Sequence, residues 1–432
     1  MIIDALLGQV RNTALIIGLV ALVGLLLQKK KTSEVINGTV KTIVGFMIFN
    51  IGSGAMSGVV NNFSALFNAG FGVEGVTTQV EVATALALNE FGTEVALVFV
   101  LGFVFNLIFA KFTRFKAIFL TGQHFLYFGA VLALVFIALD APMWVTVLAG
   151  GAVLGFAGAA LPSLAQPYMR KITGSDDIAM GHFNLIGYTF AGLIGKLFKG
   201  SKEKAGSDSQ DVNLPEFLKL FRNFVFSVAV FMSVLFYVAA IACVVNGQLP
   251  LVQEMSGNDI WFIWPLLQGL QFAAGMSVLI YGVRQFIAEI TTAFVGISEK
   301  YIPDAKPAVD CPAVFPFAPN AVLIGFVGSL LGGFFGMWLM MVFNSPVILI
   351  PAAGICFFSG GTSGVFGNAY GGWRGAAVAS FIVGIALVIL PLMLYPAFAN
   401  LGIADASFPN VDYNIVGSFI YHVINFIKGL FV

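Results

Sequence analysis

Long apolar stretches alternate with short polar segments over the whole chain. Asp, Glu, Lys and Arg are absent from five stretches, at 117–139, 141–169, 223–253, 260–283 and 311–373. A helix needs roughly 20 mostly apolar residues to cross a bilayer, and the last stretch, with about 60 residues, is long enough for two or three crossings. Strands of a membrane barrel would be shorter and would alternate in polarity. The pattern therefore predicts an all-α polytopic membrane protein with about 11 transmembrane helices.

Composition supports this prediction and excludes several function classes. Hydrophobic residues make up 59% of the 432 residues and charged residues 10%, whereas about a quarter of a soluble domain is charged. The net charge of zero gives no reason to expect nucleic acid as a partner. The three cysteines lack metal-binding or paired spacing, and the glycine-rich segments lack the ending of a P-loop. We therefore expect free thiols, no metal, no cofactor and no ATP-driven pump.

Basic residues gather in three places, and these predict the orientation in the membrane. The clusters lie within 29–31, 111–116 and 199–222. Short basic loops remain in the cytoplasm, so all three clusters are expected there, with the N-terminus outside the cell. The first residues lack the layout of a signal peptide, and 13–27 is therefore expected to be part of a retained first helix.

Several apolar segments are interrupted by Gly, Pro or polar residues, at 52–54, 300–319 and 360–364. Non-helical backbone at membrane depth is tolerated only where protein or water surrounds it, and in transporters broken helices mark the substrate site. Residues 45–59 can also be aligned with 282–296, and 91–95 with 317–321. Such pairing would suit two repeated halves, although apolar sequences also match by chance.

Ionisable residues in apolar segments are the first candidates for function, because placing them in a membrane is costly. Asp310 lies between Pro307 and Pro312, which keep the backbone extended and can present the carboxylate to a ligand. A loop-surface position is the alternative. His124 lies within an apolar segment, and His182 follows a polar loop at the start of another. In such a segment a single histidine is more often a hydrogen-bonded packing residue than a ligand.

The remaining ionisable candidates have plainer explanations. Arg284 and Glu289 are five positions apart, only partly on one helix face, so a structural or interface pair is favoured. Glu81 and Glu94 are equally compatible with a pocket and with a loop, and His422 is expected to be structural or interfacial. No nucleophile–base arrangement can be placed, so we expect no autonomous chemistry.

Ordered motifs between about 36 and 376 resemble the enzyme IIC component of the ascorbate branch of the phosphotransferase system. The matching segments are 38–47, 52–54, 120–122, 282–289, 293–303, 310–311, 317–322, 364–366 and 371–374. Many of these matches fall on Asp, Arg, Pro and Trp, which are rare in this composition. Such matches are difficult to obtain from an apolar composition alone.

The resemblance implies a substrate pocket. Carried over by motif, the pocket includes Gly52, Ser53, Gln123, His182 and Asp310, with the backbone of Gly360 and Gly361 nearby. The sequence also departs from the ascorbate pattern. Gln123 stands where that pattern has a histidine, and His124 follows one place later. Tyr127 stands in place of a glutamine, Phe183 in place of the glutamine after His182, and Val80-Glu81 in place of a Thr-Tyr pair. Changed hydrogen-bonding partners alter ligand choice sharply, so Glu81, His124 and Tyr127 join the candidate set and the identity of the sugar is left open.

The family resemblance further implies a homodimer in the bacterial inner membrane. Residues 1–432 would form one membrane domain, with a scaffold of 1–70 and 222–303 and an elevator-like core of 71–198 and 304–432. The core would carry L-ascorbate or a related sugar or polyol to a cytosolic IIB protein, whose phosphocysteine is charged by IIA. Asp310 or His182 would activate the accepting hydroxyl. Because the sequence ends without a hydrophilic domain, IIB and IIA are expected to be separate polypeptides.

Two other classes of protein are compatible with these features. An ion-coupled secondary transporter on a similar scaffold would use Asp310 and Glu81 as proton or sodium sites. A membrane sugar sensor would bind the same ligand without transporting it. A phosphorylated product that depends on IIB would distinguish the phosphotransferase permease from both.

Overall fold

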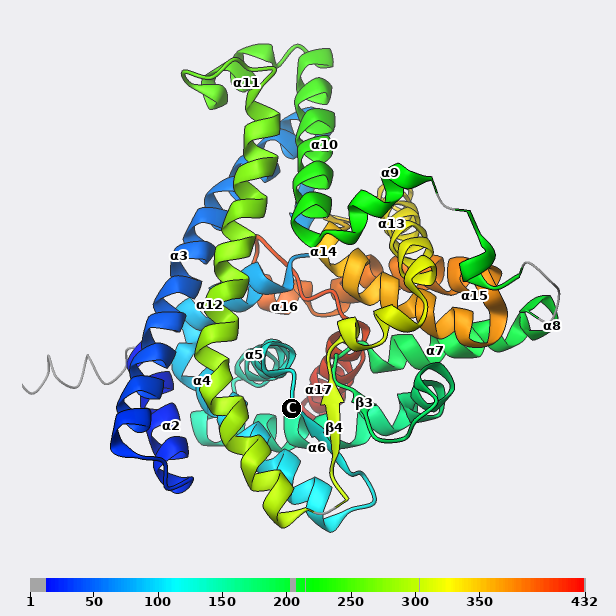
Figure 1. Ribbon diagram of the computed structural model, residues 1–432. Coiled ribbons are helices and arrows are strands. Elements are labelled where there is room, and N and C mark those ends of the chain that lie inside the picture. Colours follow the sequence, from blue (N-terminus) through cyan, green and yellow to red (C-terminus); the bar gives the residue numbers. More distant parts are fainter. Residues whose placement is uncertain (1–12, 203–206, 214, 303, 431–432) are drawn as a thin grey trace, which may run out of the picture.

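The computed structural model describes residues 13–202, 207–213, 215–302 and 304–430. Helices dominate it, as the sequence predicts, and short strands join them near the centre (Figure 1). The longer helices are α2 (Thr13–Leu27), α3 (Thr32–Phe71), α4 (Val80–Phe112), α5 (Gly122–Ala138), α6 (Met143–Thr173), α7 (Leu185–Leu197), α10 (Phe224–Val245), α11 (Leu249–Ser256), α12 (Trp264–Tyr301), α13 (Pro319–Val342), α15 (Gly361–Ile389) and α17 (Val411–Leu430).

Short helical turns connect these elements. They are α8 (Lys199–Lys202), η1 (Ser209–Asp211), α9 (Glu216–Lys219), η2 (Leu220–Arg222), η3 (Cys311–Ala313), η4 (Phe315–Phe317), α14 (Ala353–Ile355), η5 (Cys356–Gly360), η6 (Leu390–Met393) and α16 (Tyr395–Ala399). The strands are β1 (Glu74–Thr77), β2 (Ala117–Phe119), β3 (Ala179–Met180), β4 (Lys306–Val309) and β5 (Val347–Ile350). The prediction of an all-α fold contained no strands, so these five are an addition to it.

Among the described residues, seven helices are long and apolar enough to cross a membrane, which makes this a multi-pass membrane protein. They are α3, α4, α6, α10, α12, α13 and the segment Ala353–Met393 that contains α15. The prediction of about 11 spans is not reproduced. Helices α5 and α7 have only 17 and 13 residues, fewer than the roughly 20 that a helix usually needs to cross a bilayer.

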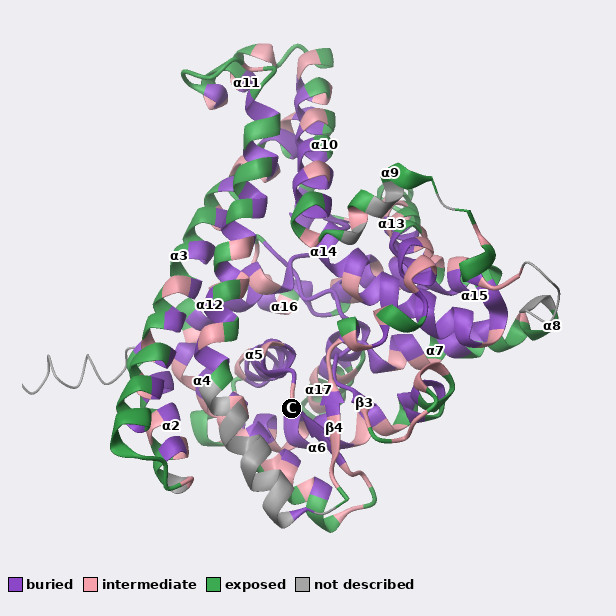
Figure 2. Cartoon of the chain, in the orientation of Figure 1, coloured by how far each residue is buried: buried purple, intermediate pink, exposed green. Residues whose placement is uncertain are grey.

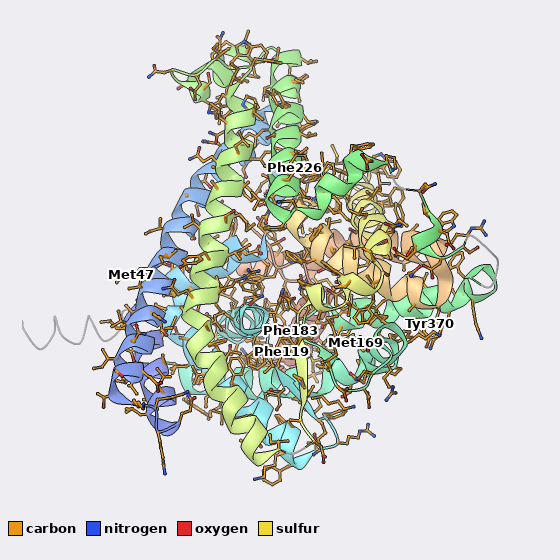
Figure 3. The ribbon with its side chains drawn as sticks, in the orientation of Figure 1. Met47, Phe119, Met169, Phe183, Phe226 and Tyr370 are labelled. Atoms are coloured by element: carbon orange, nitrogen blue, oxygen red, sulfur yellow. The ribbon has the colours of Figure 1, made fainter. Side chains whose placement is uncertain are left out.

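The outer surface of the helices is apolar, as a lipid-facing surface must be. Met47 on α3 is 52% exposed and Phe226 on α10 is 36% exposed (Figure 3), and α13 exposes Trp338. Buried residues lie on the inward faces of the same helices (Figure 2). In water such an exposed apolar surface would drive aggregation, whereas in lipid it costs nothing.

The helices pack as two groups. Helices α3 and α12 run side by side over much of their length, and α2 and α10 pack on them (Figure 1). In the second group α4, α5 and α6 pack together, and α15 packs on both α7 and α13. Small residues allow the close approach of α3 and α12: a Cβ on Gly45 would lie 2.6 Å from the backbone nitrogen of Phe286, and one on Gly282 would lie 2.8 Å from the carbonyl oxygen of Gly45.

The order of elements repeats along the chain. A long helix, a strand, a helix and a second strand follow one another as α3-β1-α4-β2 and again as α12-β4-α13-β5. The alignment of 45–59 with 282–296 falls on the equivalent helices α3 and α12. The alignment of 91–95 with 317–321 also falls at comparable positions, because α4 is kinked at Phe91, where the backbone is not helical, and α13 begins just after Phe317.

The strands pair in parallel between the two halves. Strand β1 pairs with β5, and β4 lies between β2 and β3. Each first strand therefore pairs with the second strand of the other repeat. This pairing satisfies backbone groups that would otherwise lack partners at membrane depth. The hydroxyl of Thr78 extends the β1–β5 pair by donating to the carbonyl of Ile350, 3.0 Å away, and accepting from the backbone N–H of Ala352, also at 3.0 Å.

Candidate functional site

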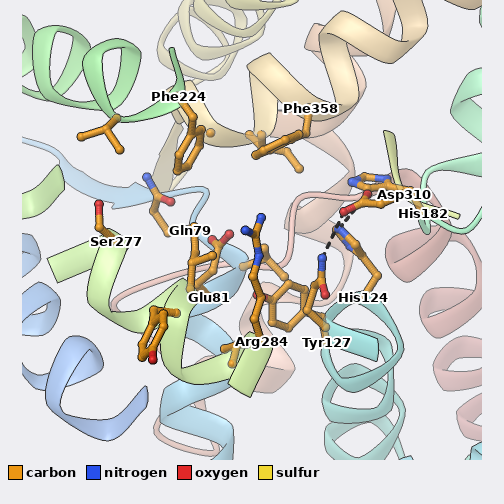
Figure 4. A pocket seen from close by; sticks show the side chains of 18 of the residues that line it. Gln79, Glu81, His124, Tyr127, His182, Phe224, Ser277, Arg284, Asp310 and Phe358 are labelled. Carbon is orange, nitrogen blue, oxygen red and sulfur yellow. Dashed lines mark hydrogen bonds and ion pairs between the residues drawn. The ribbon is translucent and has the colours of Figure 1, made fainter. Parts of the chain in front are cut away.

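A cavity of about 370 Å³, called the central cavity below, lies where the strands end (Figure 4). Its lining residues are Thr78, Gln79, Val80, Glu81, Gln123, His124, Tyr127, His182, Phe224, Val225, Ser277, Ile280, Tyr281, Val283, Arg284, Asp310, Gly354, Ile355 and Phe358. Each of the five strands is followed within a few residues by part of this lining. Helices α10 and α12 of the first helix group supply the opposite wall. The cavity therefore lies between the two groups of helices.

Asp310 directly follows β4 and forms the centre of the polar wall. Its Oδ1 accepts a hydrogen bond from the backbone N–H of Cys311 at 2.7 Å, and its Oδ2 accepts one from Nε2 of Gln123 at 3.0 Å. Oδ1 also lies 3.8 Å from Nε2 of His124. The side chain keeps 28% exposure. The carboxylate is thus fixed in position while it remains accessible to a ligand in the cavity.

The two histidines come together although they are far apart in the sequence. The ring centroids of His124 on α5 and His182 after β3 are 3.8 Å apart. Nδ1 of His182 is 2.8 Å from the hydroxyl of Tyr188, which lies 3.3 Å from Sγ of Cys311. Nε2 of His182 is buried without a hydrogen-bond partner among the described residues. A buried polar atom without a partner is costly, which makes Nε2 a candidate for binding a ligand.

Reciprocal caps hold the segment that carries His182. The carboxylate of Asp412 accepts from the backbone N–H groups of Leu185 at 2.8 Å and Ile186 at 2.9 Å, at the N-terminus of α7. Oδ1 of Asn184 accepts in turn from the backbone N–H of Val411, at 3.0 Å, at the N-terminus of α17. Each side chain satisfies donors that a helix cannot satisfy itself. The two helix ends are thereby locked together beside the cavity.

Three further side chains complete the polar lining. Glu81 lies in the first turn of α4, after β1, and Tyr127 lies one turn after Gln123 on α5. Arg284 enters from α12 and lies near both Glu81 and Tyr127 in the close view (Figure 4). Arg284 is the only Lys or Arg among the cavity's lining residues within the described part of the chain.

This arrangement combines hydrogen-bond acceptors, amide and imidazole donors, and an apolar wall made by Phe224, Ile355 and Phe358. Such a cavity suits a small ligand with many hydroxyl groups. The sequence model of the family described as PTS system sugar-specific permease component matches residues 9–412 of this chain. The chain belongs to that family.

A similar protein from Mycoplasma pneumoniae is named an ascorbate-specific PTS system EIIC component. The two are 28% identical over an alignment that covers 88% of this chain and 64% of the relative. The chain therefore spans less than two thirds of that protein's length. The family expected from the sequence motifs is confirmed by these similarities.

In this family member, six of the predicted site residues line the central cavity: Glu81, Gln123, His124, Tyr127, His182 and Asp310. The other four lie outside its lining. Gly52 and Ser53 are buried on α3, where the Cα of Gly52 faces the backbone of Leu279 on α12. Gly360 and Gly361 are buried against Ser329 and Val322 of α13. The three glycines serve close helix packing, Ser53 is buried, and a binding role for all four residues stays a prediction.

The structure also groups residues that sequence spacing did not bring together. Ligand atoms of His124, His182 and Asp310 lie within 4.8 Å of one another, a geometry that could hold a metal ion. The spacing of the three histidines gave no such indication, because Asp310, and not His422, completes the group. The hydrogen bonds of Asp310 to Gln123 and to the backbone can hold its carboxylate in the same position without a metal.

Several functional residues were missed or interpreted differently from the sequence. Arg284 was expected to form a structural or interface pair with Glu289, whose side chain lies outside the described residues, so that expectation is not tested. Arg284 lines the cavity. Tyr188, Asp412 and Asn184 were not selected. The only available signal was the combination of a polar residue with a following apolar run, which is typical of a helix N-cap. Phe183, which departs from the ascorbate pattern, stacks on Phe119 at 4.2 Å and does not line the cavity (Figure 3).

Proposed function

We propose that this protein is the sugar-translocating IIC subunit of a phosphotransferase system, and that the central cavity binds a polyhydroxylated sugar or polyol, with L-ascorbate or a related sugar acid as candidates. A cytosolic IIB protein phosphorylates the bound substrate. The observation that carries this proposal is the convergence of Gln123, His124, His182 and Asp310 at the ends of the short strands, inside a cavity between two helix groups.

In the proposed reaction, a substrate hydroxyl donates to Asp310 or to Nε2 of His182. Either group takes the hydroxyl proton as the oxygen attacks the phosphorus of the phosphocysteine on IIB. The P–S bond breaks, a P–O bond to the sugar forms, and IIB leaves as the thiolate. The side chains of Gln123 and Tyr188 fix the base in place, so the contribution of the permease is positioning and proton transfer.

The two helix groups suggest how the substrate moves. The helices α2, α3, α10, α11 and α12 supply the scaffold, and the remaining helices form a core that carries the polar wall of the cavity. Displacement of the core along α12 and α10 would expose the cavity to alternate sides of the bacterial inner membrane. A homodimer formed through the scaffold is part of the same proposal, and so are the separate IIB and IIA partners.

The charges of the lining bear on the choice among these substrates, because an ionised Glu81 beside Asp310 would favour a neutral sugar or polyol over ascorbate. Glu81 and Asp310 bring two carboxyl groups to the cavity, whereas Arg284 brings one guanidinium. Ascorbate is an anion at neutral pH and gains little in such a cavity, because a like charge is unfavourable there. We expect Glu81→Gln to strengthen the binding of L-ascorbate relative to neutral polyols, as measured by titration. Equal effects on both ligands would contradict this charge argument.

The first test is ligand-dependent thermal stabilisation of the purified protein in detergent, with L-ascorbate and a panel of neutral monosaccharides and polyols. A ligand that binds the folded state raises its apparent stability. Asp310→Asn should weaken the response about tenfold or more, since a hydrogen bond to a charged group is lost. Asp304→Asn is the matched control, because Asp304 is exposed and does not line the cavity.

If no compound stabilises the wild type, or if Asp310→Asn responds like the wild type, the assignment of the site is wrong. Transport is then measured in cells with and without IIB. Accumulation of phosphorylated sugar only with IIB supports the phosphotransferase permease. Accumulation of unmodified sugar along a proton or sodium gradient would support the ion-coupled transporter instead.

A further inference from the structure

A second cavity of about 350 Å³ adjoins the central one. It is lined by Leu120, Gly122, Gln123, Arg284, Ile287, Ala288 and Thr291, and thus lies between α12 and the first turn of α5. Among the residues that the structure describes, only Gln123 and Arg284 line both cavities. These two side chains therefore form the boundary between the central cavity and the second one.

The second cavity lies toward the basic end of the molecule. Its Thr291 is further along α12 than any residue of α12 that lines the central cavity. Helix α12 continues from there to the end where the loops after α2 and α4 carry the two basic clusters (Figure 1). The opposite end, around α11, has Glu254 and Asp259 and no Lys or Arg between 223 and 283. The third basic cluster, at 199–222, includes α8 and α9, which lie away from this end (Figure 1). By the positive-inside rule applied to the two clusters after α2 and α4, the second cavity lies on the cytoplasmic side of the central one.

Arg284 is available for a ligand. The guanidinium makes no ion pair or hydrogen bond with any residue that the structure describes, and the residue is exposed. A guanidinium presents a planar fork of donors that matches the oxygens of a phosphoryl group. Nearby, α5 begins at Gly122 without a side-chain cap, so the partial positive charge of its N-terminus adds to that of Arg284.

We propose that the second cavity is the site of the phosphoryl group, and that Arg284 binds the phosphoryl oxygens while the sugar occupies the central cavity. This inference rests on the proposed function and deepens it. The phosphocysteine of IIB reaches the sugar from the cytoplasmic side. As the P–S bond breaks and the P–O bond forms, the negative charge on the phosphoryl oxygens is neutralised by Arg284, and the hydroxyl proton passes to Asp310. Arg284 thus acts on the phosphoryl group that is transferred, and Asp310 acts on the sugar hydroxyl that accepts it.

The experiment uses the full-length protein in detergent and two probes, inorganic phosphate and the sugar or polyol that gives the largest stabilisation of the wild type. Ionic strength is held constant with chloride. Thermal stabilisation is titrated for the wild type, Arg284→Gln, Arg284→Lys and Asp310→Asn. Arg114→Gln is the matched control, since it removes the same charge from an exposed loop at the same end of the molecule.

We expect Arg284→Gln to weaken the phosphate response about tenfold or more and the sugar response by a clearly smaller factor. Asp310→Asn should do the reverse, Arg284→Lys should retain part of the phosphate response, and Arg114→Gln should change neither. A wild type that does not respond to phosphate, or an Arg284→Gln protein that loses the sugar response as fully as the phosphate response, overturns the inference. A wild type that responds to phosphate but to no sugar contradicts the proposed function alone.

Discussion

Replacing Asp412 with alanine should destabilise the protein and weaken ligand binding together. The carboxylate is fully buried and accepts two backbone hydrogen bonds, from Leu185 and Ile186. Alanine leaves both N–H groups without an acceptor and leaves a small void beside them. The affected turn begins three residues after His182, so any shift of α7 also displaces the Nε2 atom that we assign to the ligand.

The magnitude follows from the number of donors left without an acceptor. Each buried donor that loses its partner costs about 1–3 kcal/mol, so two cost about 2–6 kcal/mol. That is more than the loss of an ordinary exposed N-cap, which costs about 1 kcal/mol. Asp412→Asn retains one acceptor oxygen and places an amide group near the second N–H. It should therefore lose about half as much as alanine.

The assay is the apparent melting temperature in detergent, followed by titration with the stabilising sugar. Asp405→Ala is the matched control, because Asp405 is an exposed acidic residue in the loop before α17. We expect the order wild type, Asp405→Ala, Asp412→Asn, Asp412→Ala from most to least stable. An Asp412→Ala protein that melts with the wild type would refute the reciprocal caps as a stabilising feature.

Three other outcomes follow from single contacts. Tyr188→Phe removes the hydroxyl beside Nδ1 of His182. This change should weaken sugar binding about fivefold and shift the pH dependence of sugar binding. Tyr168→Phe, at a tyrosine outside the cavity, should have neither effect. Gly122→Ala places its Cβ against Ile287 and 2.8 Å from Oγ1 of Thr291 and should lower the melting temperature, with partial recovery in Gly122→Ala/Ile287→Ala. The hydrogen bond from Lys306, and then that from Gln166, lowers the pKa of Asp176 below its usual 3.8; the small stabilisation is therefore full above about pH 4 and is lost as the pH falls through the lowered pKa. The difference in melting temperature between the wild type and Asp176→Asn should shrink accordingly, and a constant difference would exclude this cause.

The sequence predicts most of the long helices because their apolar runs are long and free of charge. It fails where an apolar run contains two elements. The run 117–139 suggests one crossing, but its first residues form β2 and α5 begins only at Gly122. Hydrophobicity alone does not distinguish a short buried strand from part of a buried helix. The same ambiguity hides β5 within 311–373.

The candidate site was predictable where a residue is both ionisable and isolated among apolar neighbours. Asp310, His124 and His182 meet that description and all line the central cavity. Glycines carried over by motif do not reveal whether they face a ligand or a neighbouring helix, and Gly52 faces α12. Arg284 was assigned to a local pair because spacing along one helix is visible in the sequence, whereas its approach to the turn before α5 depends on tertiary packing.

The two repeats place the cavity, and the differences between them give it two unlike walls. In the first repeat, the turn from β2 into α5 carries Gln123 and His124, whereas the equivalent turn after β5 carries Gly354 and Ile355. Strands β2 and β5 belong to separate sheets, each of which pairs strands from both repeats, and the turns after both strands line the central cavity. One side of the cavity therefore presents side chains that can form hydrogen bonds, and the other presents the apolar side chains of Ile355 and Phe358. A sugar ring has hydroxyls on its rim and C–H groups on its face, so this asymmetry favours a single orientation of a cyclic substrate. It should bind such a substrate more tightly than an acyclic polyol of equal size.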